Sequence, residues 1–188
     1  RGGMGVVIKG RDTDLGRNLA IKVLLDEHKE NPQVIQRFIE EAQIGGQLQH
    51  PVIAPVYELG QFEDRRPFFT MKLVKGETLA YMLSGRRSIE QDRSRLLGIF
   101  EQVCQTMAYA HSRRVIHRDL KPANIMVGRF GQVTLIDWGM ARVAAGGTDV
   151  SVSEEFSPDQ LNSVNLMGTV RGTPGYMAPE QILQDGKV

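Results

Sequence analysis

The sequence predicts an α+β protein with two lobes: a small, β-rich N-terminal lobe with one helix, and a mainly helical C-terminal lobe. Strand-like apolar runs bounded by turn residues dominate residues 1–74, where a single helical pattern interrupts them. The longest pattern with a 3.6-residue period comes later, after residue 88. We therefore assign residues 1–74 to the first lobe and residues 75–188 to the second.

Four strand-like runs lie in the predicted N-terminal lobe. Residues 1–9 pass from glycines into an apolar run, and residues 18–24 form a second run after a turn-prone segment, which predicts a hairpin. Two further strands are expected at 52–61 and 67–74, because a charged turn separates two runs rich in β-branched and aromatic residues. Together the four runs predict a small sheet.

One helix is expected between the two pairs of strands. Asn31 followed by Pro32 is a helix start signal, because asparagine caps a helix and proline suits its first turn. The apolar residues that then recur at helical spacing are Ile35, Phe38, Ile39 and Ala42. The predicted helix runs from about Pro32 to Gln47, and its two consecutive glycines weaken its end.

The C-terminal lobe is expected to begin with the longest helix of the chain. Ser88 with Gln91 three residues on fits a capping box at its start. The residues that keep the helical period are Leu96, Leu97, Phe100, Val103, Cys104, Met107, Ala108 and His111. The place of Cys104 in this pattern predicts a buried thiol. Residues 125–127 and 133–136 then predict a short hairpin, and residues 143–167, which lack periodicity, are expected to form a mobile loop.

The composition limits which binding partners and which cellular compartment are expected. The 23 basic and 22 acidic side chains leave a net charge of +1, which gives no bulk attraction for nucleic acid or for an anionic membrane. A single cysteine excludes an internal disulfide and fits a reducing, cytoplasmic compartment. No run of eighteen apolar residues occurs, so we expect no membrane contact in this segment, while an anchor elsewhere in a longer parent stays open. The oligomeric state is also left open.

Three motifs carry the chemistry. They are His117-Arg118-Asp119-Leu120-Lys121-Pro122-Ala123-Asn124, Asp137-Trp138-Gly139 and Ala178-Pro179-Glu180. In this order and spacing they resemble the catalytic loop (117–124) and the ends of the activation segment (137–180) of protein kinases. The resemblance covers essentially the whole chain, and the style of the motifs is similar to that of eukaryotic-like bacterial Ser/Thr kinases. It implies transfer of the γ-phosphoryl group of ATP to serine or threonine hydroxyls of proteins, with Mg²⁺ as cofactor.

The resemblance also implies roles for individual residues of the catalytic loop. Asp119 would accept or orient the proton of the substrate hydroxyl, and Asn124 and Asp137 would bind Mg²⁺. Lys121 would approach the γ-phosphate, and this lysine is typical of Ser/Thr kinases. Further upstream, Lys22 would hold the α- and β-phosphates and pair with a helix glutamate. That glutamate is expected to be Glu41, and Glu40 is the alternative.

The expected nucleotide site draws on several short segments. Gly2 and Gly5 match the later glycines of a glycine-rich loop, whose backbone approaches the phosphates because no side chain blocks it. Met71, Lys72 and Val74 resemble the hinge that meets adenine through its backbone. The residues expected to sandwich the adenine ring are Val7, Ala20 and Met126; an ordinary core role is the alternative reading for them.

The resemblance implies regulation by phosphorylation of the activation segment. Arg118 would meet a phosphate on Thr169, whereas Thr173 would form hydrogen bonds near Asp119 and Lys121. The alternative phosphorylation sites are Ser151, Ser153, Ser157 and Ser163. His117 is expected to pack beside Trp138 and to have no part in proton transfer.

Two other functions compete with that of an active kinase. One is a pseudokinase or scaffold that binds nucleotide or a partner without catalysis, which commonly lacks one of the residues at positions 22, 119 and 137; all are present here. The other is a small-molecule phosphotransferase of related fold, which the platform-like segment 173–180 disfavours. The chain is expected to be cut at both ends, so the isolated segment is expected to be a poor kinase.

Overall fold

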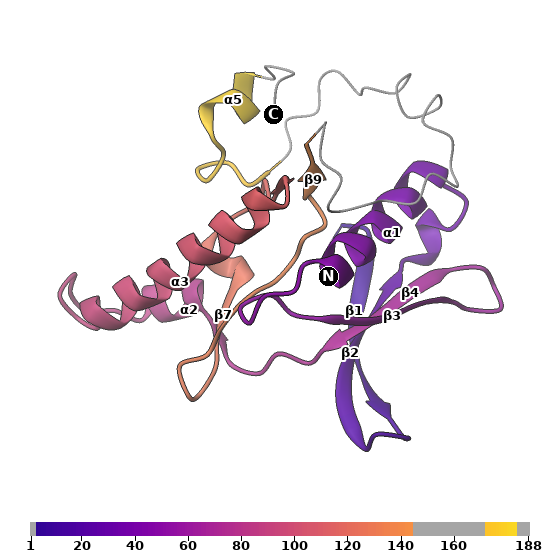
Figure 1. The fold of residues 1–188 in the computed structure, drawn as a ribbon, viewed down its shortest axis with the longest axis horizontal. Coiled ribbons are helices and arrows are strands. Elements are labelled where there is room, and N and C mark those ends of the chain that lie inside the picture. The colour runs from indigo at the N-terminus through magenta and orange to yellow at the C-terminus, as the bar shows by residue number, and fades with distance from the viewer. Residues whose placement is uncertain (1–2, 145–171, 184–188) are drawn as a thin grey trace.

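The computed structural model describes residues 3–144 and 172–183, drawn in colour in Figure 1. Its strands are β1 (Gly5–Asp12), β2 (Arg17–Leu24), β3 (Val56–Gln61), β4 (Pro67–Lys72), β5 (Glu77–Thr78), β6 (Val115–Ile116), β7 (Ile125–Val127), β8 (Val133–Leu135) and β9 (Arg142–Val143). Its α-helices are α1 (Pro32–Gln47), α2 (Leu79–Ser84), α3 (Arg93–Ser112) and α5 (Pro179–Leu183). Short 3-10 helices span Asp26–His28 and Pro122–Asn124.

An antiparallel sheet with strand order β1-β2-β4-β3 and helix α1 form the N-terminal part. The side chain of Asn31 caps α1 by accepting hydrogen bonds from the backbone N–H groups of Gln33 and Val34. The helix packs on the sheet through Phe38, whose ring centroid lies 5.2 Å from that of Phe69 on β4. The predicted hairpin, the capped helix and the small sheet are all confirmed.

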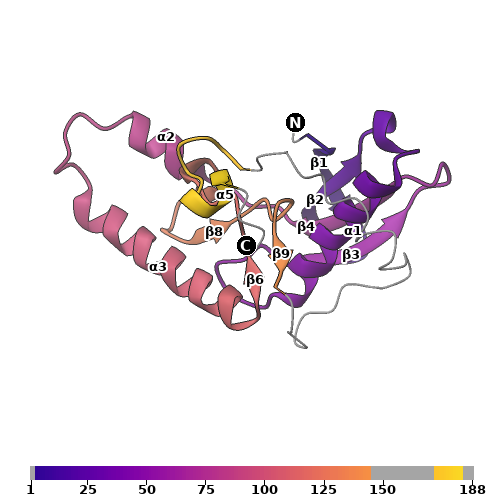
Figure 2. The same cartoon turned by 90° about the horizontal axis from the view of Figure 1, so that it is seen from above.

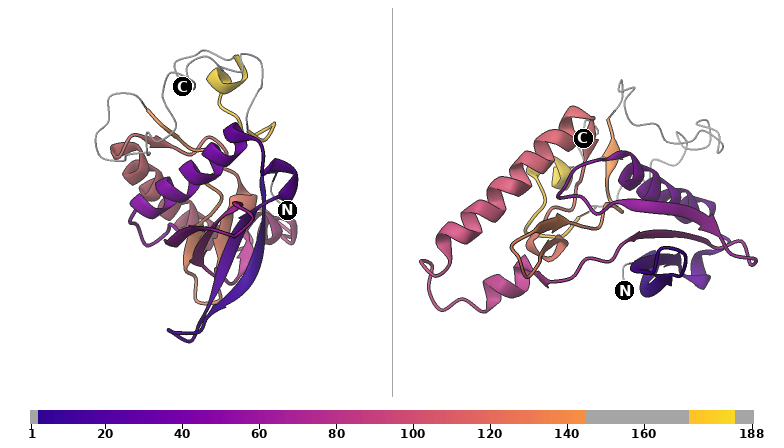
Figure 3. Two further views of the ribbon diagram at one scale, coloured as in Figure 1. Left: turned by 90° about the vertical axis from the view of Figure 1, so that its right-hand side faces the viewer. Right: turned by 60° about the horizontal axis from the view of Figure 1, so that its bottom comes forward.

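A second, larger core joins the end of α1 to the helical part of the chain. Its buried residues come from α1, from the segment after it, from α3 and from β6 to β8; among them are Ile44, Ile53, Val103, Val115 and Leu135. Figures 1 and 2 show the four-stranded sheet and α1 at one end of the molecule and α2 and α3 at the other. The right view of Figure 3 shows the same separation from another side, and the left view looks along the molecule from the end that carries the four-stranded sheet. The α+β architecture with a β-rich N-terminal part is therefore confirmed.

Several element boundaries differ from the prediction; strand β4, for example, ends at Lys72 and not at Val74. Strand β3 begins at Val56, and Val52 and Ile53 instead bridge to β8, where Leu135 N–H donates to the Val52 carbonyl at 2.6 Å. Proline at position 55 has no N–H to donate to a ladder, which separates this bridge from β3. Helix α3 begins at Arg93, after Asp92, whose φ is 58°. The predicted capping box at its start is wrong, because the Ser88 hydroxyl accepts the Gln91 N–H within a turn that precedes the helix.

The prediction of a buried thiol at Cys104 is wrong, because this side chain is exposed. Helix α3 carries two apolar stripes. One stripe, with Ile99, Val103 and Ala110, is buried, whereas Leu97 and Phe100 are 57% and 64% exposed on the other. Cys104 belongs to the exposed stripe, about 100° around the helix from Val103.

Helix α2 and the two-residue strands β5, β6 and β9 were not predicted. Strand β5 pairs with β7, and β6 pairs with β9, so each depends on a partner far along the chain. Among the described residues, no helix has the length and apolar character needed to cross a membrane.

Candidate active site

A buried ion pair connects the sheet to α1. Lys22 Nζ on β2 lies 2.5 Å and 2.7 Å from the two carboxylate oxygens of Glu41 on α1, and the two residues are 8% and 7% exposed. Burial raises the pKa of Glu41, and the positive charge of Lys22 opposes that rise. A desolvated pair of this kind needs good geometry, and the bidentate contact supplies it. The contact with Glu41 therefore fixes the position of the Lys22 ammonium between β2 and α1.

The helix explains why Glu41 is the partner and Glu40 is not. Glu41 shares the buried side of α1 with Phe38 and Ala42, which pack on the sheet. Glu40 is half-buried and accepts a hydrogen bond from Gln36 at 3.1 Å, one helical turn earlier. Glu40 and Glu41 are consecutive residues of the helix, so their side chains point to different sides of it.

A second cluster forms around the Asp119 carboxylate. Its Oδ1 accepts a hydrogen bond from the Thr173 hydroxyl at 2.7 Å, and its Oδ2 accepts from Lys121 Nζ at 2.7 Å. Lys121 Nζ also donates to Thr173 Oγ1 at 2.6 Å, which closes a three-membered network. Partial burial favours the neutral carboxyl, but the donors from Lys121, Thr173 and Asn124 outweigh it and lower the pKa of Asp119. The carboxylate is therefore ionised at neutral pH.

Asn124 connects this cluster to the segment that carries Asp137. Its Nδ2 donates to the Asp119 carbonyl at 2.9 Å and to Asp119 Oδ2 at 3.2 Å, which fixes the nitrogen end of the amide. Its own backbone carbonyl accepts the N–H of Ile136 at 2.9 Å, so the residue directly before Asp137 is hydrogen-bonded to the catalytic loop. Asp137 itself is exposed and has a φ of 64°, in the left-handed region.

The donor set of Asn124 and Asp137 suits magnesium. Mg²⁺ takes oxygen ligands, and proteins commonly bind it with one or two carboxylates while substrate phosphates and water complete the shell. Within residues 3–144 and 172–183 no group of three or more His, Cys, Asp or Glu side chains is arranged to hold a metal ion alone. An amide oxygen and one carboxylate fit a cation that arrives with phosphates.

Gly139 lets the Asp137 segment lie against Glu41. A Cβ at this position would lie 2.9 Å from Glu41 Oε2 and 3.4 Å from Asp137 Oδ1. The first distance is shorter than real contacts allow, so any other residue here requires the Glu41 carboxylate or the Asp137 segment to shift. The negative charge of Asp137 also contributes to the raised pKa of Glu41, after burial.

His117 and Trp138 stack between the catalytic loop and the Asp137 segment, with ring centroids 4.6 Å apart. His117 is 1% exposed, and burial lowers its pKa, so the ring is neutral at pH 7. Its Nδ1 accepts the Asp119 N–H at 3.3 Å. Among the described residues the buried Nε1 of Trp138 has no hydrogen-bond partner, so packing holds the indole there.

The residues predicted to meet adenine lie on separate elements. Ala20 on β2 is directly opposite Met71 on β4, and Val7 on β1 is opposite Lys22. Val7 is exposed, whereas Ala20 is buried. Met126 belongs to the other sheet, on β7 between Thr78 and Thr134.

The predicted hinge residues Lys72 and Val74 flank the point where β4 ends, and Val74 is half-buried. The Lys72 N–H donates to the Pro55 carbonyl at 3.1 Å, so a ligand contact from the Lys72 backbone has to use its carbonyl oxygen. The structure therefore limits which of the predicted hinge contacts Lys72 can make.

Gly5 has a packing role that the sequence did not suggest. A Cβ there would lie 2.8 Å from the Val23 carbonyl oxygen and 3.2 Å from the Phe38 ring. Close approach of β1 to its neighbours therefore requires glycine at this position. Gly2, the other predicted phosphate-loop glycine, lies outside the described residues, as does Thr169.

Arg118 joins three segments of the site. Its φ is 62°, an uncommon conformation for a residue with a side chain. Its Nε donates to the Met140 carbonyl at 2.7 Å, and its own carbonyl accepts a hydrogen bond from Gln181 Nε2 at 3.0 Å. The contact with Gln181 was missed from the sequence. A glutamine at the third position of a short helix that begins with proline indicates a bond back to the cap, but not the bond to Arg118.

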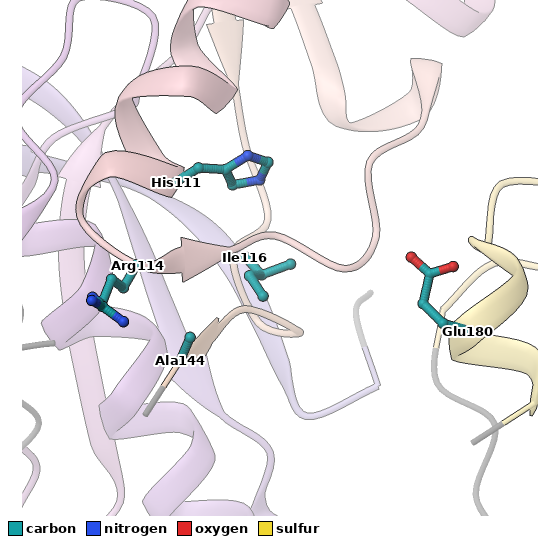
Figure 4. A pocket seen from close by; sticks show the side chains of 5 residues that line it. All are labelled: His111, Arg114, Ile116, Ala144 and Glu180. Carbon is teal, nitrogen blue, oxygen red and sulfur yellow. The ribbon is translucent and has the colours of Figure 1, made fainter. Parts of the chain in front are cut away.

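An open pocket lies away from these clusters (Figure 4). Its volume is about 360 Å³, and its lining residues are His111, Arg114, Ile116, Ala144 and Glu180. Figure 4 shows Glu180 on the α5 side and His111, Arg114 and Ile116 on the side formed by the end of α3 and by β6. No residue of the Lys22 or Asp119 cluster lines it, so we do not assign it to the chemistry.

The fold and the two charged clusters fit the class of phosphoryl-transfer proteins. They combine a paired lysine on a strand, a carboxylate held by lysine and threonine, and two oxygen-bearing side chains, Asn124 and Asp137, on segments joined by a backbone hydrogen bond. Comparison with known proteins agrees with this class. The family model described as the protein kinase domain matches residues 1–188.

Relatives among curated proteins point the same way. The chain is 36% identical to the serine/threonine-protein kinase PknD of Protochlamydia amoebophila, 35% to that of Chlamydia pneumoniae and 37% to that of Chlamydia muridarum. Each match covers 97% of this chain and 20% or 21% of the relative, so the chain spans about a fifth of their length. The chain belongs to the protein kinase domain family.

Proposed function

We propose that this chain is the catalytic core of a protein Ser/Thr kinase that uses ATP and Mg²⁺. The observation that carries the proposal is the closed network of Asp119, Lys121 and Thr173, in which an ionised carboxylate and an ammonium lie together beside Asn124. Phosphoryl transfer depends mainly on positioned charges, and this network provides them.

Asp119 serves as the base or proton acceptor. The substrate hydroxyl oxygen forms a bond to the γ-phosphorus as the bond from that phosphorus to the bridging oxygen of ADP breaks. The hydroxyl proton passes to the Asp119 carboxylate, and ADP leaves with the bridging oxygen. The lowered pKa of Asp119 supports the role, because the group is in its accepting form at neutral pH.

Cations of the protein balance the phosphate charge. Lys22, held by Glu41, contacts the α- and β-phosphates, and Lys121 approaches the γ-phosphate. Asn124 and Asp137 hold Mg²⁺, which supplies electrophilic stabilisation of the phosphate oxygens. The glycines at 2 and 5 and the hinge at 71–74 bind the rest of the nucleotide, with Val7, Ala20 and Met126 against adenine.

The remaining assignments extend the same proposal. The lobes divide at residue 74, the substrates are proteins with serine or threonine hydroxyls, and a cytoplasmic location fits a protein that uses ATP and has an exposed, unpaired thiol. Phosphorylation of Thr169 and its capture by Arg118 regulate the enzyme.

A radiolabel assay tests the proposal. The intact protein is incubated with γ-labelled ATP, Mg²⁺ and a generic protein substrate, and the product is hydrolysed for phosphoamino-acid analysis. Label in phosphoserine or phosphothreonine that is absent with Asp137→Ala supports the function. Nucleotide binding without label transfer favours the pseudokinase alternative, and label confined to phosphotyrosine contradicts the hydroxyl class.

A further inference from the structure

The side chain of Gln181 bridges two segments of the site. Its Oε1 accepts the backbone N–H of Ala178 at 3.1 Å, which caps the N-terminus of α5. Its Nε2 donates to the backbone carbonyl of Arg118 at 3.0 Å, across 63 positions of the chain. The first bond orients the amide, and the second directs its donor to the catalytic loop.

The acceptor belongs to the peptide unit between Arg118 and Asp119. The carbonyl of this unit belongs to Arg118, and its N–H belongs to Asp119. That N–H donates to His117 Nδ1 at 3.3 Å, so the described contacts hold the unit from both ends. The φ of 62° at Arg118 lies in a region that side chains disfavour, so the unit needs external contacts to stay there.

Packing around the carbonyl adds to the constraint. Gly172, with a φ of 131°, lies so close that a Cβ there would be 3.2 Å from the Arg118 oxygen. Both ends of the segment 172–181, Gly172 and Gln181, therefore lie close to the Arg118 carbonyl of the catalytic loop. A carboxylate at position 181 accepts the Ala178 N–H equally well but has no proton to give to Arg118.

We propose that Gln181 is a positioning residue, which orients the Arg118–Asp119 peptide and thereby the Asp119 carboxylate toward the reacting hydroxyl. The consequence for turnover rests on the proposed kinase function, whereas the positioning itself does not. The described hydrogen bonds of Gln181 go to the backbone of Ala178 and of Arg118, and neither residue is a proposed nucleotide contact. We therefore expect its loss to lower the rate of transfer and to leave ATP binding intact.

The test compares Gln181→Glu with Gln61→Glu in the intact protein. Gln61 is a matched control, because its Nε2 donates at 2.7 Å to the carbonyl of Arg65, another arginine with positive φ, at the distant β3–β4 turn. We expect kcat to fall about tenfold or more in Gln181→Glu with little change in KM for ATP, and Gln61→Glu to match the wild type. Gln181→Asn, one methylene too short to reach both partners, should behave like Gln181→Glu.

Hydrogen exchange provides the readout that does not depend on activity. Exchange of the peptide that covers residues 117–121 should quicken in both Gln181 variants and stay unchanged in Gln61→Glu. Unchanged exchange in that peptide overturns the proposal, as does a rise in KM for ATP with kcat unaltered. An inactive wild-type protein contradicts the proposed function, and the exchange result then decides the positioning alone.

Discussion

The Thr173 hydroxyl donates a hydrogen bond to Asp119 Oδ1 at 2.7 Å, although the two residues are 54 positions apart. The same hydroxyl accepts from Lys121, so one side chain near the end of the activation segment completes the network around the Asp119 carboxylate. The arrangement links the orientation of Asp119 to the docking of residues 172–183 on the catalytic loop. The predictions below follow from this link and from the Lys22–Glu41 pair.

Thr173→Val should lower kcat by about tenfold, because it removes the donor to Asp119 and the acceptor for Lys121 while keeping the side-chain volume. Thr173→Ser keeps the hydroxyl and should retain most of the activity. Steady-state phosphotransfer assays of both variants provide the measurement. Equal loss in the valine and serine variants would show that the methyl group matters and the hydroxyl does not.

A double-mutant cycle should separate the two charges of the buried pair. Lys22→Met alone or Glu41→Leu alone should each destabilise the folded domain by about 3 kcal/mol, because each leaves a buried charge without its partner. The combined variant should be more stable than the sum of the two losses predicts, while all three variants lose activity. Denaturant unfolding measures the free energies, and strict additivity would argue against a coupled pair.

Gly139→Ala should weaken catalysis through Glu41. The added Cβ would lie 2.9 Å from Glu41 Oε2, so either this carboxylate or the Asp137 segment has to move. We expect a higher KM for ATP and a lower kcat. Gly98→Ala is the control, because no atom lies within 4 Å of its Cβ and alanine stabilises a helix by about 1 kcal/mol. Gly139→Ala with wild-type kinetics would refute the close approach.

The stability of the folded protein should depend on pH through the ionisation of Asp119. Since its folded-state pKa is lowered, its ionised form contributes stability above the ordinary carboxyl value of about 3.9, and this contribution is lost as pH falls through the folded-state pKa. The difference in thermal midpoint between wild type and Asp119→Asn should therefore be larger at pH 6 than near pH 4. A difference that grows on acidification would mean that the folded-state pKa is raised.

Local patterns predicted the N-terminal sheet and α1 well, because their apolar residues face one core and their caps and turns are local. They failed for Cys104 because α3 is apolar on two sides, and periodicity alone cannot tell which stripe is buried. The short strands β5, β6 and β9 escaped notice because two residues carry no period, and only distant pairing defines them.

The candidate site was predicted mainly by motif. The motifs identified Asp119, Asn124 and Asp137, but not the contacts that hold them, such as the Ile136 bond to the Asn124 carbonyl. Spacing along the chain also gave no sign that Gln181 reaches Arg118 or that Gly139 makes room for Glu41, since both depend on how distant segments pack.

The most direct test of the central claim is the turnover of Asp119→Asn measured beside its affinity for Mg-ATP. Asparagine keeps the shape of the side chain but cannot accept a proton at neutral pH. The account predicts that kcat for transfer to a protein substrate falls by about a hundredfold or more while nucleotide affinity stays within about twofold of wild type. Wild-type kcat in Asp119→Asn, with the same nucleotide affinity, would contradict the role of Asp119 and the account built on it.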